Sequence, residues 1–216
     1  ANRAAMPEDL VPQIPYIKKI VAAFNLPGLE MPGFEADDII ATLAKRFAAR
    51  DMEITVVTGD KDLMQIVDDH IHLLDTMKDK VSGPAEVAER FGGADKVIEV
   101  QALAGDSSDN VPGVPGIGEK TATKLLTEYG TVEGVIENLH LLPKGVRAKI
   151  EADLDMLHLS RELAEIRCDV PVVCELAECL WELQRDTAAR KFNELEFGSL
   201  MHLIGGIAEE RDDRGI

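Results

Sequence analysis

Apolar residues near the start of the chain recur every three to four positions, which is the period of a helix with one buried face. The first such series covers 7–24, where Pro12 and Pro15 leave the start of the helix open. After a stretch rich in proline and glycine at 26–33, a second series begins at Phe34. Its apolar positions are Ile39, Ile40, Leu43 and Phe47. The pattern therefore predicts an amphipathic helix on each side of this break.

The pattern then changes to short runs rich in β-branched residues, which are typical of strands. Residues 53–58 read Glu-Ile-Thr-Val-Val-Thr and predict a buried strand with a parallel neighbour. A second strand is expected at 71–74, and a third at 80–82 on an edge of the sheet. So few strands make a marginal sheet. The shortage predicts that the parent protein supplies further strands from a segment before Ala1.

The second half of the chain has a helical pattern, interrupted by a loop at 105–118 and an extended run at 171–176. The helices are expected at 84–91, 95–104, 121–129, 131–138, 143–154, 157–166, 186–195 and 197–203. The charged residues at 209–215 lack any pattern and predict a linker or tail. The expected organisation is an α/β domain at 1–104, a helical subdomain at 105–205 and a tail at 206–216.

The loop at 105–118, G-D-S-S-D-N-V-P-G-V-P-G-I-G, joins two kinds of chemistry. In its first half, Asp106 and Asp109 are accessible carboxylates of the kind that hard cations such as Mg²⁺ prefer. Its second half contains Gly113, Gly116 and Gly118. These glycines allow a tight turn with uncovered N–H groups before a helix, which suits a phosphate. The alternative is a surface turn beside two solvated aspartates, and the adjacency of the two halves argues against it.

Two further groups of acids lie where an α/β fold places active sites. Glu35, Asp37 and Asp38 crowd the first turn of a helix, more than capping requires. Asp60 and Asp62 follow the first predicted strand, where an N-cap is the alternative role for one of them. These carboxylates, with no His or Cys among them, fit Mg²⁺ or Mn²⁺ rather than zinc. Two such ions about 4 Å apart can support phosphodiester hydrolysis.

Composition changes this picture only in part. The chain has 216 residues, of which 45% are hydrophobic and 29% charged, as expected of a folded globular protein without a membrane span. A net charge of −17 argues against a nucleic-acid partner, although bound metal would neutralise part of it. Three cysteines without C-x-x-C spacing are interpreted as ordinary thiols of a reducing cytosol. They are Cys168, Cys174 and Cys179.

Four motifs, in order along nearly the whole chain, resemble one family. They are E-A-D-D-I-I at 35–40, T-G-D-K-D-L-M-Q at 58–65, G-D-S-S-D-N-V-P-G-V-P-G-I-G-E-K-T-A at 105–122 and L-E-F-G-S-L at 195–200. They are similar to the 5′→3′ exonuclease domain of bacterial DNA polymerase I, a member of the flap-endonuclease family. The resemblance implies an α/β, PIN-like parallel sheet with flanking helices, followed by a helical subdomain with a DNA-binding helix-three-turn-helix.

The resemblance also assigns roles to residues. The metal carboxylates that it implies are Glu35, Asp37, Asp38, Asp60, Asp62, Asp106 and Asp109. Asp37, Asp38 and Asp60 are expected nearest a first ion, and Asp106 and Asp109 nearest a second, with Mg²⁺ or Mn²⁺ as the metal. The helix-three-turn-helix would span 113–129 and hold K⁺. Its implied DNA contacts are Gly113, Gly116, Ile117, Gly118, Lys120, Thr121 and Lys124.

The implied function is metal-dependent 5′→3′ exonuclease and 5′-flap endonuclease activity in bacterial replication and repair. The implied partners are flapped, nicked or primed DNA, RNA primers and a fused polymerase domain; the expected state is a cytoplasmic, nucleoid-associated monomer. The family begins with a strand bearing another metal aspartate and a basic arch, which this chain lacks. One alternative is therefore a duplex-binding fragment that is catalytically incomplete. Another is an acidic Ca²⁺-binding or interaction domain, although D-S-S-D-N lacks the spacing of an EF-hand loop.

Overall fold

The computed structural model describes residues 5–206 and divides into two compact units. Unit 1 spans Met31–Val172, and unit 2 combines the residues up to Glu30 with those from Val173 onward. The α/β domain and the helical subdomain predicted from sequence thus share unit 1 for most of their length. The boundary at 104/105 stays a prediction. The predicted tail at 206–216 lies outside the described residues except for Gly206.

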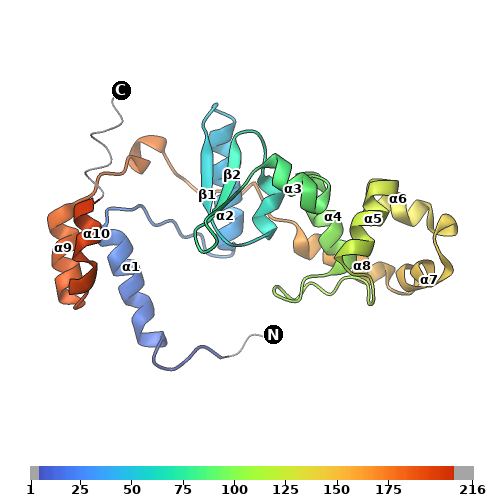
Figure 1. Ribbon diagram of the computed structural model, residues 1–216, viewed down its shortest axis with the longest axis horizontal. Coiled ribbons are helices and arrows are strands. Elements are labelled where there is room, and N and C mark those ends of the chain that lie inside the picture. Colours follow the sequence, from blue (N-terminus) through green and yellow to red (C-terminus); the bar gives the residue numbers. More distant parts are fainter. Residues whose placement is uncertain (1–4, 207–216) are drawn as a thin grey trace. The chain divides into compact units, whose positions relative to one another are not determined.

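Unit 1 contains a three-stranded sheet in the order β1-β2-β3, at the positions that the sequence pattern predicts (Figure 1). The strands are β1 (Ile54–Val57), β2 (Ile71–Asp75) and β3 (Lys80–Ser82). β1 and β2 are parallel, with Ile54 opposite Ile71. β3 runs antiparallel to β2, so the sheet is mixed rather than wholly parallel as expected. Within residues 5–206, β1 pairs with β2 alone, and its other edge is open.

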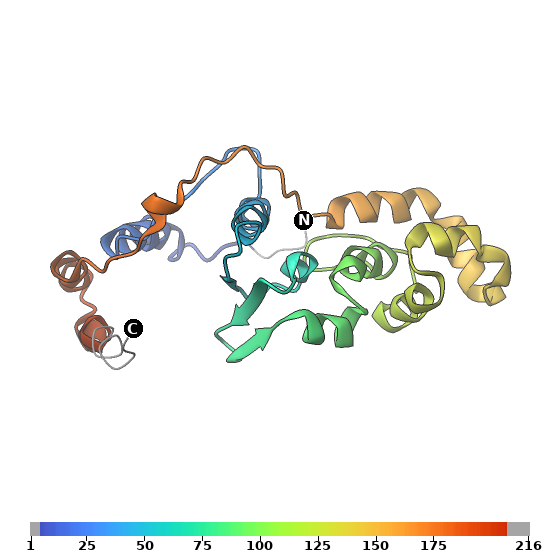
Figure 2. The same cartoon turned by 90° about the horizontal axis from the view of Figure 1, so that it is seen from above.

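The helices of unit 1 begin and end close to the predicted positions. They are α2 (Ala36–Ala48), η2 (Asp62–Ile66), α3 (Pro84–Phe91), α4 (Ala94–Ala104), α5 (Glu119–Tyr129), α6 (Val132–Glu137), η3 (Leu139–Leu141), α7 (Lys144–Ala152) and α8 (Leu154–Ala164). α2 packs on β1 and β2, while α4 contacts η2, α3, α5 and α8 (Figure 2). α4 therefore joins the sheet side of the unit to its helical side.

One continuous apolar core runs through unit 1 from the sheet to α8. Its fully buried side chains include Leu63, Ile71, Leu103, Ile150 and Leu157. α4 is buried on most sides, and two of its buried residues are polar, Glu99 and Gln101. Because a buried polar group costs free energy unless it is hydrogen-bonded, these two residues indicate where α4 contacts something polar.

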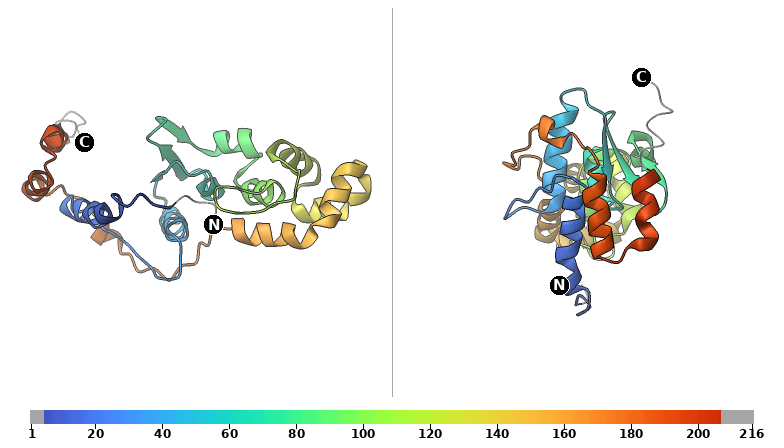
Figure 3. Two further views of the ribbon diagram at one scale, coloured as in Figure 1. Left: turned by 90° about the horizontal axis from the view of Figure 1, so that it is seen from below. Right: turned by 90° about the vertical axis from the view of Figure 1, so that its left-hand side faces the viewer.

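Unit 2 is helical and is built from both ends of the chain. Its elements are η1 (Val11–Gln13), α1 (Ile14–Ala23), η4 (Leu176–Cys179), α9 (Arg185–Glu194), η5 (Gly198–Leu200) and α10 (Met201–Gly206). α9 packs against α1 and α10, and the right-hand view of Figure 3 shows α9 and α10 side by side. The Trp181 indole donates a hydrogen bond to the Phe24 carbonyl at 2.7 Å, which ties the two segments together.

The structure defines the start of the N-terminal helix, which Pro12 and Pro15 left open in the sequence. The α-helix begins at Ile14, after the short helix η1, and the two prolines occupy the first turns of η1 and α1. Ile20 and Phe24 pack into the small core around Phe192. No disulfide joins the three cysteines, although the Cys174 and Cys179 sulfurs lie 3.2 Å apart. Among residues 5–206, no helix has the length and apolar character needed to cross a membrane.

Candidate functional site

Three of the predicted metal-binding carboxylates converge at one point of unit 1. Carboxylate oxygens of Asp62, Asp106 and Asp109 all lie within 4.8 Å of one another. Asp62 begins η2, just past the carboxyl end of β1, and the other two belong to the loop after α4. The three carboxylates therefore meet beyond the carboxyl end of β1, a position where open α/β sheets commonly carry their ligands.

The turn after β1 is fixed by its own side chains. The amide of Thr58 donates to the Leu74 carbonyl at 3.0 Å and extends the parallel ladder by one residue. The Thr58 hydroxyl then accepts the Asp60 amide, and Asp60 Oδ1 accepts the Asp62 amide, each at 3.0 Å. These bonds fix the turn that leads from β1 into η2.

The loop that carries Asp106 is closed at both ends. Asp106 and Val111 exchange two backbone hydrogen bonds of 2.8 Å, which brings the start and the end of the acidic segment together. The amide of Gly113 then donates to the buried hydroxyl of Ser160 on α8 at 2.9 Å. The acidic loop and the glycine-rich turn that follows it are therefore held as one rigid piece against α8.

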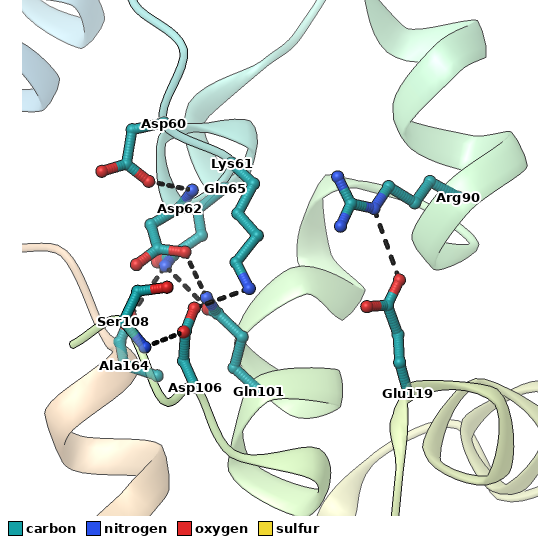
Figure 4. Close-up of polar contacts among 10 residues, drawn as sticks. All are labelled: Asp60, Lys61, Asp62, Gln65, Arg90, Gln101, Asp106, Ser108, Glu119 and Ala164. Atoms are coloured by element: carbon teal, nitrogen blue, oxygen red, sulfur yellow. Dashed lines mark hydrogen bonds and ion pairs between the residues drawn. The ribbon is translucent and has the colours of Figure 1, made fainter. Parts of the chain in front are cut away.

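The carboxylate of Asp106 is buried, with only 2% of its side chain exposed. Oδ1 accepts the Ser108 amide at 2.8 Å, and the Lys61 ammonium lies 2.6 Å from Oδ2 (Figure 4). The contact between Lys61 and Asp106 is an ion pair by distance. It lacks the alignment of a hydrogen bond, and Oδ2 accepts none from the described residues. Burial alone would raise the pKa of Asp106, but Lys61 and Ser108 hold that pKa below its ordinary value.

The pKa of Asp62 is shifted in the opposite direction from that of Asp106. Gln101, the buried amide on α4, donates a hydrogen bond to Asp62 Oδ1 (Figure 4). Burial, together with the charges of Asp60 and Asp106, raises the pKa of Asp62 to about 6 despite this bond. A carboxylate that is crowded by other carboxylates binds a proton more readily, and a divalent cation relieves the same repulsion. The buried Oδ2 atom of Asp106 and the raised pKa of Asp62 both fit a cation-binding site.

The acids at the start of α2 belong to the same electrostatic group. Burial, and then the charges of Asp60, Glu35 and Asp109, raise the pKa of Asp37. The two carboxylate oxygens of the neighbouring Asp38 accept hydrogen bonds from the amides of Glu35, at 3.2 Å, and Arg167, at 2.9 Å. Asp38 therefore caps α2 and holds the segment after α8, while Asp37 is close enough to Asp60 and Asp109 to be affected by their charges.

The raised pKa of Asp62 predicts that metal binding depends on pH. Its proton must leave before the carboxylate can bind a cation, so the apparent affinity for Mn²⁺ should fall as the pH drops below about 6. Between pH 6 and 5 we expect a loss of up to about tenfold, measured by Mn²⁺ titration. In chelator, the free energy of unfolding depends on pH in the opposite direction. The stabilisation that comes from protonated Asp62 is complete below the ordinary carboxyl pKa and is lost as the pH rises through about 6.

Asp62→Asn is expected to weaken both pH dependences, and Asp69→Asn is the matched control. Asp69 is exposed and lies outside the cluster. If the pH dependence of Mn²⁺ binding were identical in the two variants, Asp62 would not be the titrating ligand.

The glycine-rich turn lies between the acidic loop and α5. Gly116 has a φ of 79°, and its carbonyl accepts a hydrogen bond from the Lys149 ammonium at 2.9 Å. The side chain of Ile117 is buried in the core, whereas Gly118 is exposed at the N-cap of α5. The turn is thus anchored by two buried apolar side chains, Val114 and Ile117, and Gly118 at the start of α5 is exposed.

A groove of about 600 Å³ lies beside the first turns of α5. Its lining residues are Arg90, Glu119, Lys120, Thr123, Lys124 and Thr127. Arg90 Nε and Glu119 Oε1 form an ion pair of 3.3 Å, which links α3 to α5 (Figure 4). The cations outnumber the single carboxylate, so this face is locally basic although the chain is acidic as a whole.

Sequence reasoning missed several of these contacts. Lys61 and Gln65 lie inside a quoted motif but were given no role, yet Lys61 pairs with Asp106 and Gln65 donates to the Ala164 carbonyl at 2.7 Å. Gln101 could have been found as a polar residue on an apolar helix. Arg90 and Lys149 had no such signal, because each acts on an element that is distant in sequence.

Comparison with protein families defines the class to which this fold and site belong. The N-terminal resolvase-like domain of 5′-3′ exonucleases matches residues 1–92, and the C-terminal SAM fold of the same enzymes matches residues 93–187. The chain therefore belongs to the 5′-3′ exonuclease family.

Individual relatives agree with this assignment. The chain is 47% identical to DNA polymerase I of Rhizobium leguminosarum, over 94% of this chain and 20% of that protein. It is 46% identical to a 5′-3′ exonuclease of Bacillus subtilis, over 88% of this chain and 65% of the relative. The chain thus spans about a fifth of the first relative's length and just under two thirds of the second's.

Solved structures share the fold. T5 5′-exonuclease with bound divalent metal ions (zinc) superimposes with a TM-score of 0.69 at 21% identity, covering 89% of this chain and 71% of that one. The catalytic core of Rad2 in complex with DNA substrate gives a TM-score of 0.55 at 17% identity, covering 88% and 66%. A resolvase-like α/β fold with a helical SAM-like part is therefore shown for this chain.

Proposed function

We propose that the chain carries most of the catalytic domain of a metal-dependent 5′ nuclease that hydrolyses DNA phosphodiesters. One observation supports this most strongly. The acidic loop and the glycine-rich turn are pinned together through Gly113 and Ser160, so a cation site and a backbone-binding turn are held at a fixed separation. A strand held at the turn would therefore present its phosphates to the carboxylates.

The proposed metal ligands are the seven predicted acids, used as two groups. Asp37, Asp38 and Asp60 would serve one ion, and Asp62, Asp106 and Asp109 the other, with Glu35 at the rim. Bound Mg²⁺ or Mn²⁺ would supply positive charge against the developing charge of the phosphodiester and would acidify water. Lys61 and Gln101 act through the acids: Gln101 holds Asp62 in place, and Lys61 holds Asp106 in the metal-free site.

The proposed DNA contacts are the uncovered N–H groups around Gly116, Ile117 and Gly118. The start of a helix favours an anion, and Gly113, Lys120, Thr121 and Lys124 complete the predicted surface. Arg90 extends it from α3 into the same groove. A K⁺ ion at this turn would compete with Lys149 for the Gly116 carbonyl.

For the parent protein we propose the wider role of the relatives. It would remove 5′ flaps and RNA primers during replication and repair in the bacterial cytoplasm, bound to nucleoid DNA. Fusion to a polymerase domain and a monomeric state complete the proposal, and the DNA polymerase I relatives support the fusion.

The proposal is tested by cleavage of an end-labelled 5′-flap duplex with Mg²⁺, with Mn²⁺ and with chelator. Metal-dependent cutting at the flap junction is the expected result. Binding without cutting would make the chain a DNA-holding fragment instead. Absence of both would contradict the nuclease assignment and the assignment of the turn to DNA binding.

The basic groove makes a prediction about DNA binding. Lys124→Gln should weaken binding to duplexes of any sequence, because the lysine would reach phosphates rather than base edges. In plots of log affinity against log salt concentration, measured by fluorescence anisotropy, the slope should become less negative by about 0.9. Lys80→Gln on β3 removes an exposed lysine far from the groove in sequence and is the control. Equal slopes in both variants would exclude Lys124 from the interface.

A further inference from the structure

Lys61 occupies an unusual position among the acids. It stands between Asp60 and Asp62 in sequence, and its ammonium reaches across to Asp106 on another element (Figure 4). The turn that presents it is fixed, since Asp60 Oδ1 accepts the Asp62 amide at 3.0 Å and the Lys61 carbonyl accepts the Met64 amide at 3.0 Å. The contact with Asp106 is therefore a product of the local fold.

The carboxylate that Lys61 contacts requires a positive neighbour. Asp106 is almost fully buried, and its Oδ2 has no aligned hydrogen bond from the described residues. Its surroundings are negative, with oxygens of Asp62 and Asp109 within 4.8 Å. A buried charge without a counter-ion strongly destabilises a fold. With a side chain that is 33% exposed, Lys61 can supply this charge and can also move out into solvent.

We propose that Lys61 is the resident counter-ion of the carboxylate cluster, and that a divalent cation displaces its ammonium from Asp106 when it binds. This inference rests on the proposed metal-dependent function. The Ser108 amide occupies Asp106 Oδ1, so a metal that binds through Oδ2 would compete with the Lys61 ammonium for that oxygen. Lys61 is therefore a positioning residue with two effects. It keeps the metal-free cluster folded, and it lowers the affinity of the cluster for metal.

The first test is thermal unfolding in excess chelator. Lys61→Met should lower the melting temperature by at least about 4 °C, because it leaves Asp106 buried and unpaired. Adding Asp106→Asn to this variant should restore most of the loss, since it removes the unpaired charge. Lys45→Met is the matched control. It breaks the 2.8 Å ion pair with Asp68, whose two side chains are 39% and 41% exposed, and should change the melting temperature little. Equal melting temperatures for Lys61→Met and the unsubstituted protein would overturn the inference.

The second test is Mn²⁺ binding, followed by the electron paramagnetic resonance signal of free Mn²⁺. Lys61→Met should bind the Asp106-dependent ion roughly tenfold more tightly, an effect that a merely structural role would not produce. Lys61→Gln, a neutral variant that keeps a hydrogen-bond donor, should shift the affinity in the same direction and serves if the first variant folds poorly. Lys45→Met should leave the affinity unchanged.

The outcomes separate this inference from the proposed function. Binding that is equal or weaker in both Lys61 variants would overturn the displacement of Lys61 while leaving the metal site intact. If neither the unsubstituted protein nor the Lys61 variants showed Mn²⁺ binding that Asp106→Asn abolishes, the metal site itself would be overturned.

Discussion

Asp106→Asn is expected to reduce metal-dependent cleavage of a 5′-flap duplex by at least about 1,000-fold, which corresponds to several kcal/mol of lost transition-state stabilisation. Asp106 is the most buried acid of the cluster, and its carboxylate is fixed by Ser108 on one oxygen and Lys61 near the other. An amide at this position keeps the shape but removes the charge that holds the cation. The measurement is single-turnover cleavage at saturating Mg²⁺.

Asp69→Asn is the matched control for this substitution, because it replaces the same carboxylate oxygen by an amide nitrogen in an exposed acid outside the cluster. Its cleavage rate should equal that of the unsubstituted chain. DNA binding by Asp106→Asn in chelator should be retained, since the turn is built on separate contacts. Cleavage by Asp106→Asn within a few fold of normal would show that the cluster is not the catalytic centre.

Gly113→Ala is expected to lower the free energy of unfolding of unit 1 by about 3–4 kcal/mol. Gly113 has a φ of 63°, and a Cβ there would lie 2.2 Å from the backbone nitrogen of Gly105. The two segments must separate to accept it, which also breaks the hydrogen bond from Gly113 to Ser160. The melting temperature should fall by about 6–16 °C.

Gly145→Ala is the control for this prediction, since it adds the same methyl group in α7 where a Cβ meets nothing within 4 Å. Alanine favours a helix, so this variant should be as stable as the original or slightly more so. A melting temperature for Gly113→Ala close to that of Gly145→Ala would mean that the junction is loose. The coupling of the acidic loop to the turn would then lose its structural basis.

The local elements of this fold follow from local sequence patterns. The β-branched run before Thr58 forms β1, and the apolar face that includes Ile39 and Phe47 packs α2 into the unit. The convergence of Asp62, Asp106 and Asp109 could also be predicted, since the end of a strand and a loop after a helix meet at one edge of an α/β sheet.

Contacts between distant side chains could not be predicted in this way. The pairing of Lys61 with Asp106 depends on how η2 meets the loop after α4, and no periodicity encodes that distance. The direction of β3 is set by the short turn after Asp75, which brings the chain back along β2. The apolar pattern did not predict that the two ends of the chain form a separate unit. The helices at each end have ordinary amphipathic patterns, which do not specify the partner against which they pack.

The construction of unit 2 has a consequence for the order in which the protein folds. Phe24 and Trp181, joined by a hydrogen bond, are separated by 157 residues, so α1 leaves the ribosome long before its partners on α9 exist. Unit 1 is contiguous and can close its core in the meantime. Until α9 is made, Ile20 and Phe24 lack Phe192, the apolar side chain around which they pack in the folded unit. Completion of this small helical unit is therefore a late event in synthesis, because it requires both ends of the described chain.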